Sequence, residues 1–214
     1  MSQPFQVIVV LGIAVGVSAT MGCNSGGDGG VISQPPADVA GIWDTVATNA
    51  GSSILTGCTG DFASLNGLTA AAVLSAANCQ DSGPIVTVQS GDSYTHLARD
   101  FACDDGNYGT RAGGGTVSGN SLAGQMDTIS QAYGYTGSAF VTGTVTSADH
   151  IALSQNRITS NGSVVGSCNF SPALSISVTI VSTTALSSQA GAKEGAAGVV
   201  TPSCMGSYLG RRAK

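Results

Sequence analysis

The stretch LSISVTI, residues Leu174–Ile180, decides the fold class, because large aliphatic residues alternate strictly with small hydroxyl residues. Successive side chains of a β-strand point to opposite faces of the sheet, so this period of two predicts a strand with one apolar and one polar face. Straight-chain helix formers are rare in the rest of the chain: eleven of the twelve acidic residues are Asp, and only two residues are Lys. With 31 glycines as well, the sequence predicts an all-β fold.

Turn signals on the N-terminal side of this stretch divide the chain into short strands. Gly119-Asn120 fits a type II′ turn, and Ser147–Asp149 separates two further β-rich runs. Asn161-Gly162 is typical of a two-residue type I′ turn. We count about 8–10 strands, most of them joined by short turns into an antiparallel meander. Because an open meander leaves two unpaired edges, we expect closure into a barrel, with a β-sandwich as the alternative.

One short helix is expected near residues 69–77, where Thr69 is a suitable N-cap before a run of good helix formers. After Val181 the composition shifts to Ser, Ala and Gly, so residues 182–214 are predicted to be a low-complexity tail, mostly disordered or loosely docked. The expected β-domain therefore occupies residues 40–181.

The N-terminal residues have the pattern of an export signal. The apolar run from Val7 to Ala19 is short for a membrane span and fits the central region of a secretory signal. It leads into Thr20-Met21-Gly22-Cys23, and residues 23–39 are rich in Gly, Ser and Pro, as expected of a flexible tether. We expect residues 1–22 to be a signal peptide and the protein to be exported.

The Gly22-Cys23 junction resembles the lipobox of bacterial lipoproteins, a family in which the signal is cut just before a diacylated Cys. The resemblance implies lipidation of Cys23 and anchoring to the bacterial cell envelope, at the outer membrane or its periplasmic face. Thr20 and Met21 stand where the family usually has Leu and then Ala or Ser. Ordinary secretion after cleavage behind Ala19, which would leave Cys23 a plain thiol, is the alternative.

The chain has six cysteines, and spaced cysteines of an exported protein usually form disulfides. If Cys23 is lipidated, an odd number remains. We predict two disulfides, with open pairing, among Cys58, Cys79, Cys103 and Cys168. Cys204 is then the unpaired thiol, because it lies in the expected tail. Buried free cysteines without bridges are the alternative.

Gly41-x-Trp43 opens the first expected strand, and Trp43 is the only Trp of the chain. Together with the meander, this pair resembles the opening of lipocalin-like and avidin-like barrels, in which the Trp plugs one end. The resemblance implies that Trp43 is a barrel plug, with Arg157 as the candidate to stack on it. It also implies a carrier of a small apolar ligand, in which small inward residues such as Ala139 and Gly143 leave room. An ordinary core Trp is the alternative.

We find no recognisable catalytic or metal-binding motif. His96 and His150 lie outside known nucleophile and zinc patterns, so we expect both to be structural or exposed. The acidic cluster of Asp100, Asp104 and Asp105 does not match calcium-loop spacing, and a hairpin turn at Asp105-Gly106 beside a disulfide is preferred. We therefore predict no catalytic residues, no metal and no cofactor.

Charge excludes one class of partner. The formal net charge is −5, and the body between Val31 and Val181 has only three basic residues, so no basic face for nucleic acid is expected. The favoured function is a non-enzymatic, lipid-anchored envelope protein whose β-domain is an interaction module for another envelope component. A lipocalin-like carrier of a small apolar ligand is the alternative. A hydrolase is less favoured, since it needs His96 or His150 beside a Ser and an Asp in one cleft.

Overall fold

The computed structural model describes residues 34–182 and 200–212, and every structural statement below concerns these residues. The predicted signal peptide, Cys23 and the tether up to residue 33 lie outside them. The strands and helices, in chain order, are β1 (Gly41–Ala47), β2 (Ile54–Gly60), the 3-10 helix η1 (Asp61–Leu65), α1 (Ala70–Ala77), β3 (Cys79–Asp81), β4 (Ile85–Ser90), β5 (Ser93–Cys103), β6 (Tyr108–Ser118), β7 (Ser121–Ser130), β8 (Tyr135–Ser147), β9 (His150–Gly162), β10 (Gly166–Ser182) and α2 (Pro202–Arg212).

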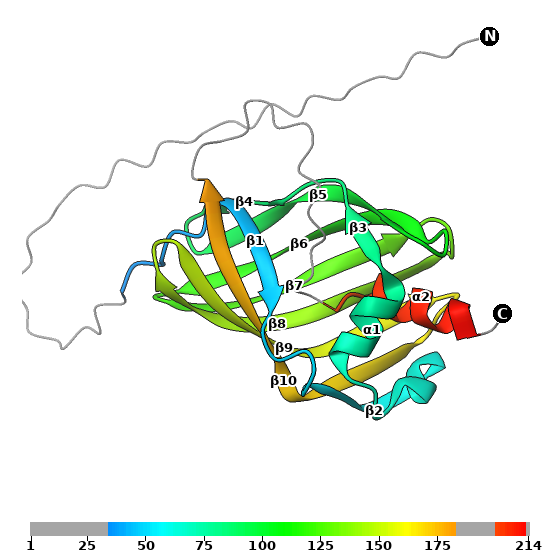
Figure 1. The fold of residues 1–214 in the computed structure, drawn as a ribbon. Helices are drawn as coiled ribbons and strands as arrows, with labels where there is room; N and C mark the ends of the chain where they lie inside the picture. Colours follow the sequence, from blue (N-terminus) through cyan, green and yellow to red (C-terminus); the bar gives the residue numbers. More distant parts are fainter. Residues whose placement is uncertain (1–33, 183–199, 213–214) are drawn as a thin grey trace, which may run out of the picture. The chain divides into compact units, whose positions relative to one another are not determined.

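Eight antiparallel strands close into a barrel (Figure 1). The order runs β1-β4-β5-β6-β7-β8-β9-β10, and β10 returns to pair with β1, with Trp43 opposite Ile180 and Ala47 opposite Ile176. β2 and β3 are additional strands, which pair with β10 and β5. The all-β class, the meander and the barrel are confirmed, and the sandwich alternative is wrong.

The strand that decided the fold class has the expected two faces. Leu174, Ile176 and Val178 of β10 are buried, whereas Ser175 and Ser177 between them are partly exposed. The aliphatic face completes a core of aliphatic and aromatic side chains. Since closing the barrel pairs both edges of the meander, this apolar face needs no second sheet to cover it.

One predicted turn is confirmed and another is wrong. Gly119 has a φ of 54° in the two-residue turn between β6 and β7, as a type II′ turn requires. Asn161 and Gly162, by contrast, still belong to β9, where they pair with Thr136 and Tyr135 of β8. The turn to β10 follows at residues 163–165. Pairing with the long strand β8 thus overrides the local turn preference.

The chain between β1 and β4 leaves the barrel and returns, forming β2, η1, α1 and β3 on the way. The predicted helix near residues 69–77 is confirmed as α1: the Thr69 hydroxyl accepts a hydrogen bond from the Ala72 amide at 3.2 Å. The helix ends at Asn78, which has a φ of 40°.

Cys58 of β2 is bonded to Cys168 of β10. Cys79 of β3 is bonded to Cys103 of β5. Each disulfide therefore holds one additional strand on the barrel.

The end of the chain differs from the predicted tail. α2 packs against α1 and the ends of β7, β8 and β9, and Figure 1 shows the two helices together at one end of the barrel. Val200 and Met205 are fully buried, and Cys204 is unpaired but buried rather than in a loose segment. The composition did not indicate this docking because small Ser, Ala and Gly side chains have little hydropathy contrast. Residues 183–199 lie outside the described part.

Candidate functional site

A cavity of about 50 Å³ lies inside the barrel, in the half nearer to the β6–β7 and β8–β9 turns. We call it the Trp43 cavity. Most of its wall is apolar and comes from strands all around the barrel. Its apolar lining includes Trp43, Ile85, Leu122, Met126, Ile151 and Val178.

The size of the Trp43 cavity limits what it holds. One water molecule needs about 10–15 Å³ of such space, so the cavity accommodates roughly three to five waters or a molecule of similar size. Ala139 and Gly143, which were expected to leave room for a ligand, do not line it. Ala139 is fully buried, and a Cβ atom at Gly143 would lie 2.4 Å from Leu153 Cδ2, so Leu153 occupies the side-chain side of Gly143.

One side of the Trp43 cavity is polar and includes Thr45, Thr87, Tyr94 and His96. The Thr87 hydroxyl and His96 Nδ1 are 2.9 Å apart and share a hydrogen bond. Burial, and secondarily the positive charge of Arg99, lower the pKa of His96 to about 4. His96 is therefore neutral at neutral pH, and the cavity wall presents hydrogen-bonding groups without a net charge.

Tyr94 is an aromatic member of this polar wall and is as buried as Thr87. It is 4% exposed, its ring centroid is 5.3 Å from that of His96, and burial raises its pKa to about 12. Two glycines make space for the ring: a Cβ atom would lie 2.7 Å from the Tyr94 hydroxyl at Gly115 and 2.1 Å from it at Gly124. Gly115 of β6 and Gly124 of β7 thus let an aromatic ring lie against the barrel wall.

Trp43 is buried, with 3% exposure, and its indole nitrogen donates a hydrogen bond to the Val39 carbonyl at 3.0 Å. The residues just before β1 are hydrogen-bonded beside two turns near the cavity, β4–β5 and β6–β7. The Val39 amide donates to Gln89 Oε1 at 2.7 Å, and the Ala37 amide donates to the Gly119 carbonyl at 2.8 Å. Arg157, the expected stacking partner, is exposed on β9 and does not cover Trp43. The indole of Trp43 is instead held by the Val39 carbonyl, in the backbone before β1.

The opposite end of the barrel contains a buried charge cluster that the sequence did not indicate. Asp81 contacts both Arg99, at 3.2 Å, and Arg111. Arg111 is 3% exposed, lies 4.6 Å from the centre of the Phe101 ring, and donates a hydrogen bond to the Ser203 hydroxyl of α2. These contacts attach α2 to the barrel. Strand register alone brings the three charges together.

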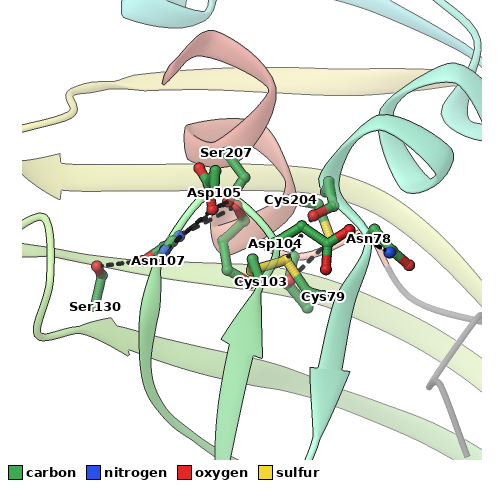
Figure 2. The surroundings of a disulfide bond; sticks show 12 residues. Asn78, Cys79, Cys103, Asp104, Asp105, Asn107, Ser130, Cys204 and Ser207 are labelled. Atoms are coloured by element: carbon green, nitrogen blue, oxygen red, sulfur yellow. Dashed lines mark hydrogen bonds between the residues drawn. A yellow bond between two sulfur atoms is a disulfide. The ribbon is translucent and has the colours of Figure 1, made fainter. Parts of the chain in front are cut away.

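A second polar network joins α2 to the β5–β6 turn (Figure 2). Asn107 donates from its amide nitrogen to the Tyr135 hydroxyl at 2.8 Å and to Ser207 at 3.2 Å, and Ser207 donates to Asp105 at 3.1 Å. Asn78 donates to Asp104 at 2.6 Å. The acidic residues of this turn are thus hydrogen-bonded beside the Cys79–Cys103 disulfide. No cluster of three potential metal ligands occurs in the described part of the chain.

His150 lies outside the barrel, beside a serine. Its Nε2 is 2.8 Å from the Ser177 hydroxyl, and its Nδ1 is 2.7 Å from the Thr146 hydroxyl. The Asp149 carboxylate instead accepts a hydrogen bond from Ser147 at 2.6 Å. In residues 34–182 and 200–212, neither His96 nor His150 is hydrogen-bonded to a carboxylate. A Ser-His-Asp arrangement is therefore not assembled at either histidine.

Comparisons with known proteins return nothing: no family model, no curated protein and no solved structure matches this chain. The eight-stranded antiparallel barrel is consistent with the lipocalin-like architecture expected from Gly41-x-Trp43. Neither helix of the described residues combines the length and the apolar composition that a membrane crossing needs. The candidate site is therefore defined by its own chemistry, which is a small apolar cavity with one polar side.

Proposed function

We propose that this protein is a non-enzymatic, lipid-anchored protein of the bacterial cell envelope whose barrel binds a small, largely apolar molecule. The Trp43 cavity supports the proposal. An apolar cavity with a few converging polar groups, two of which have strongly shifted pKa values, is the usual form of a small-molecule site.

The volume of the cavity restricts the proposed ligand. Drug-sized ligands occupy pockets of about 300–1,000 Å³, and the Trp43 cavity is far smaller even after allowing for the different measures of volume. A long acyl chain or a polycyclic ligand does not fit without rearrangement of the wall. The proposed cargo is therefore smaller than the ligands expected of a wide, hollow barrel.

The proposed anchor depends on the N-terminal sequence. The apolar run before Gly22-Cys23 and the Gly-rich segment after it support diacylation of Cys23, and two acyl chains give stable membrane attachment where one is marginal. Mass spectrometry of the membrane fraction should find an acylated N-terminal Cys23. A soluble protein that begins at Thr20 would contradict the anchor but not the ligand site.

A second candidate function is an interaction module for another envelope protein. It is favoured by the barrel half near α2, which is filled by fully buried side chains such as Phe62, Leu65 and Ile158. In that case the surface, and not the interior, carries the function. A photo-crosslinking residue can be placed at the exposed position of Phe140. Capture of one defined envelope protein, equally efficient when the cavity is blocked, would favour this candidate.

The ligand site can be tested with 1-chlorobutane, which has a size suited to the Trp43 cavity. Trp43 supplies the only indole N–H of the chain, so one NMR signal reports on the wall. We expect a saturable shift of this signal in the native protein. Val141→Phe should block the cavity, whereas Val88→Phe, at an outer position that is 49% exposed, is the matched control. A non-saturable response, or binding unaffected by Val141→Phe, would contradict the proposal.

A further inference from the structure

Three polar groups on the wall of the Trp43 cavity have no hydrogen-bond partner among the residues that the structure describes. They are the Tyr94 hydroxyl, His96 Nε2 and the Thr45 hydroxyl. Tyr94 is 4% exposed and Thr45 is 9% exposed, but neither hydroxyl is fully enclosed by protein, so each is open to what occupies the cavity. Polar groups inside native proteins are nearly always hydrogen-bonded, and those facing a cavity are paired with water or with a bound molecule. A ligand with a hydrogen-bonding group can take the place of such water.

The charge of the site indicates a neutral ligand. Burial keeps His96 uncharged at neutral pH, because its pKa is lowered to about 4. Arg99 is committed elsewhere: it contacts Asp81 at 3.2 Å and donates to the Gly83 carbonyl at 3.3 Å. A carboxylate or an ammonium in the cavity would therefore lose its hydration without gaining an opposite charge, which is strongly unfavourable.

The donor and acceptor pattern favours a hydroxyl group. If Thr87 donates to His96 Nδ1, then Nε2 carries a proton and donates; if Nδ1 donates to Thr87, then Nε2 accepts. The hydroxyls of Tyr94 and Thr45 donate or accept equally well. An alcohol is complementary to this wall for either tautomer, because one hydroxyl group both donates and accepts. A carbonyl can only accept, and a halide has no comparable hydrogen-bonding capacity.

We propose that the Trp43 cavity binds a small neutral alcohol, whose hydroxyl bonds to the neighbouring Tyr94 and His96 and whose hydrocarbon part contacts Leu122, Met126 and Val178. This inference rests on the proposed function of the cavity as a ligand site. A space that holds three to five waters suits roughly three to five non-hydrogen atoms, and 1-butanol has five. For so small a ligand, the upper limit of affinity per atom corresponds to a Kd of about micromolar, and weaker binding is expected.

The test compares two molecules of equal length, 1-butanol and 1-chlorobutane, by NMR titration of the Trp43 indole signal in the full mature protein. The alcohol should bind about 10-fold more tightly, the gain that one to two net hydrogen bonds provide. Tyr94→Phe should weaken 1-butanol binding by about 3- to 10-fold and leave 1-chlorobutane binding unchanged. Butylammonium should not bind.

Tyr133→Phe is the matched control, because the Tyr133 hydroxyl bonds to Asp105 at the other end of the barrel. It should change neither affinity. Equal binding of the two molecules, or equal losses in Tyr94→Phe and Tyr133→Phe, would overturn the hydroxyl proposal and leave the apolar site intact. Binding of neither molecule would overturn the ligand site itself. Butylammonium that binds as tightly as 1-butanol would contradict the neutral class.

Discussion

Asp81→Asn should be among the most destabilising single changes in this protein. The Asp81 carboxylate lies between two guanidinium groups, those of Arg99 and Arg111, and it is 8% exposed. Asn keeps the shape of the side chain but removes the charge. Two buried cations would then repel each other without the carboxylate that neutralises them. Arg111 would also be a poorer partner for Ser203, so the attachment of α2 should weaken.

The expected cost is about 3–5 kcal/mol, the range for removing one member of a buried ion pair. A domain of 150–250 residues loses about 2–4 °C of Tm per kcal/mol, so Tm should fall by roughly 6–20 °C. Urea unfolding and thermal unfolding, both followed by circular dichroism under oxidising conditions, measure the two quantities. Limited proteolysis near α2 should also become faster in the variant.

Two comparisons make this prediction specific. Asp92→Asn is the matched control at an exposed position and should change the free energy of unfolding by less than about 0.5 kcal/mol. The double variant Asp81→Asn with Arg111→Met should lose less stability than the sum of the two single variants, because one buried cation is removed together with its partner. A loss below about 1 kcal/mol for Asp81→Asn, or strict additivity in the double variant, would refute the reasoning.

Three further predictions concern the barrel. Burial lowers the pKa of His96 from its ordinary 6.5 to about 4, so on acidification the unfolded chain takes up a proton before the folded protein does. The contribution of His96 to the free energy of unfolding should therefore be complete above about pH 6.5 and fall by roughly 3 kcal/mol towards pH 4. His96→Gln should flatten that part of the profile, and an unchanged slope would contradict it. Trp43→Ala should lower the free energy of unfolding by about 3–5 kcal/mol, because it leaves a cavity in the core and removes the hydrogen bond to the Val39 carbonyl. A loss under about 1 kcal/mol would show that the indole is not needed for stability. Each disulfide can be removed in a paired Cys→Ser variant. The free energy of unfolding should fall by about 5 kcal/mol without Cys58–Cys168, whose sequence separation is 110, and by about 3–4 kcal/mol without Cys79–Cys103, whose separation is 24. A larger loss for the shorter loop would contradict the argument that a disulfide stabilises by restricting the unfolded chain.

The sequence predicted those parts of the fold that local patterns determine. The alternation in Leu174–Ile180 defines a strand with one buried face, and the Thr69 cap with its run of small helix formers defines α1. The turn at Gly119 followed from the positive φ that glycine tolerates. These features depend on residues within a few positions of one another, and for that reason a single sequence contains them.

The parts that were missed depend on residues far apart in the chain. Asn161-Gly162 has a strong local turn preference, but pairing with Tyr135 and Thr136 of β8 keeps it in a strand. The docked position of α2 requires Ser203, Ser207 and their barrel partners, and small polar residues give no periodic signal in advance. The meeting of Asp81 with two arginines likewise depends on strand register and not on any local motif.

The candidate site was only partly predictable. Trp43 was singled out as the only Trp on the first strand, and the structure buries it on the wall of the cavity. The polar wall was not foreseen, although a signal existed: Tyr94 and His96, two residues apart on β5, face Gly115 and Gly113 on β6. Where two rings stand opposite two glycines, the rings can lie across the neighbouring strand. Which large residue faces which glycine becomes known only when the strand pairing is known.

Xenon binding tests the central claim, a small apolar ligand site inside the barrel, most directly. Xenon binds in apolar spaces inside proteins and is easily located in electron density. A crystal of the mature protein under xenon pressure should contain a xenon atom between Trp43, Met126 and Val178, and Val141→Phe crystals should lack it. Xenon absent from this position in the native crystal, or a cavity filled by rearranged side chains, would contradict the account.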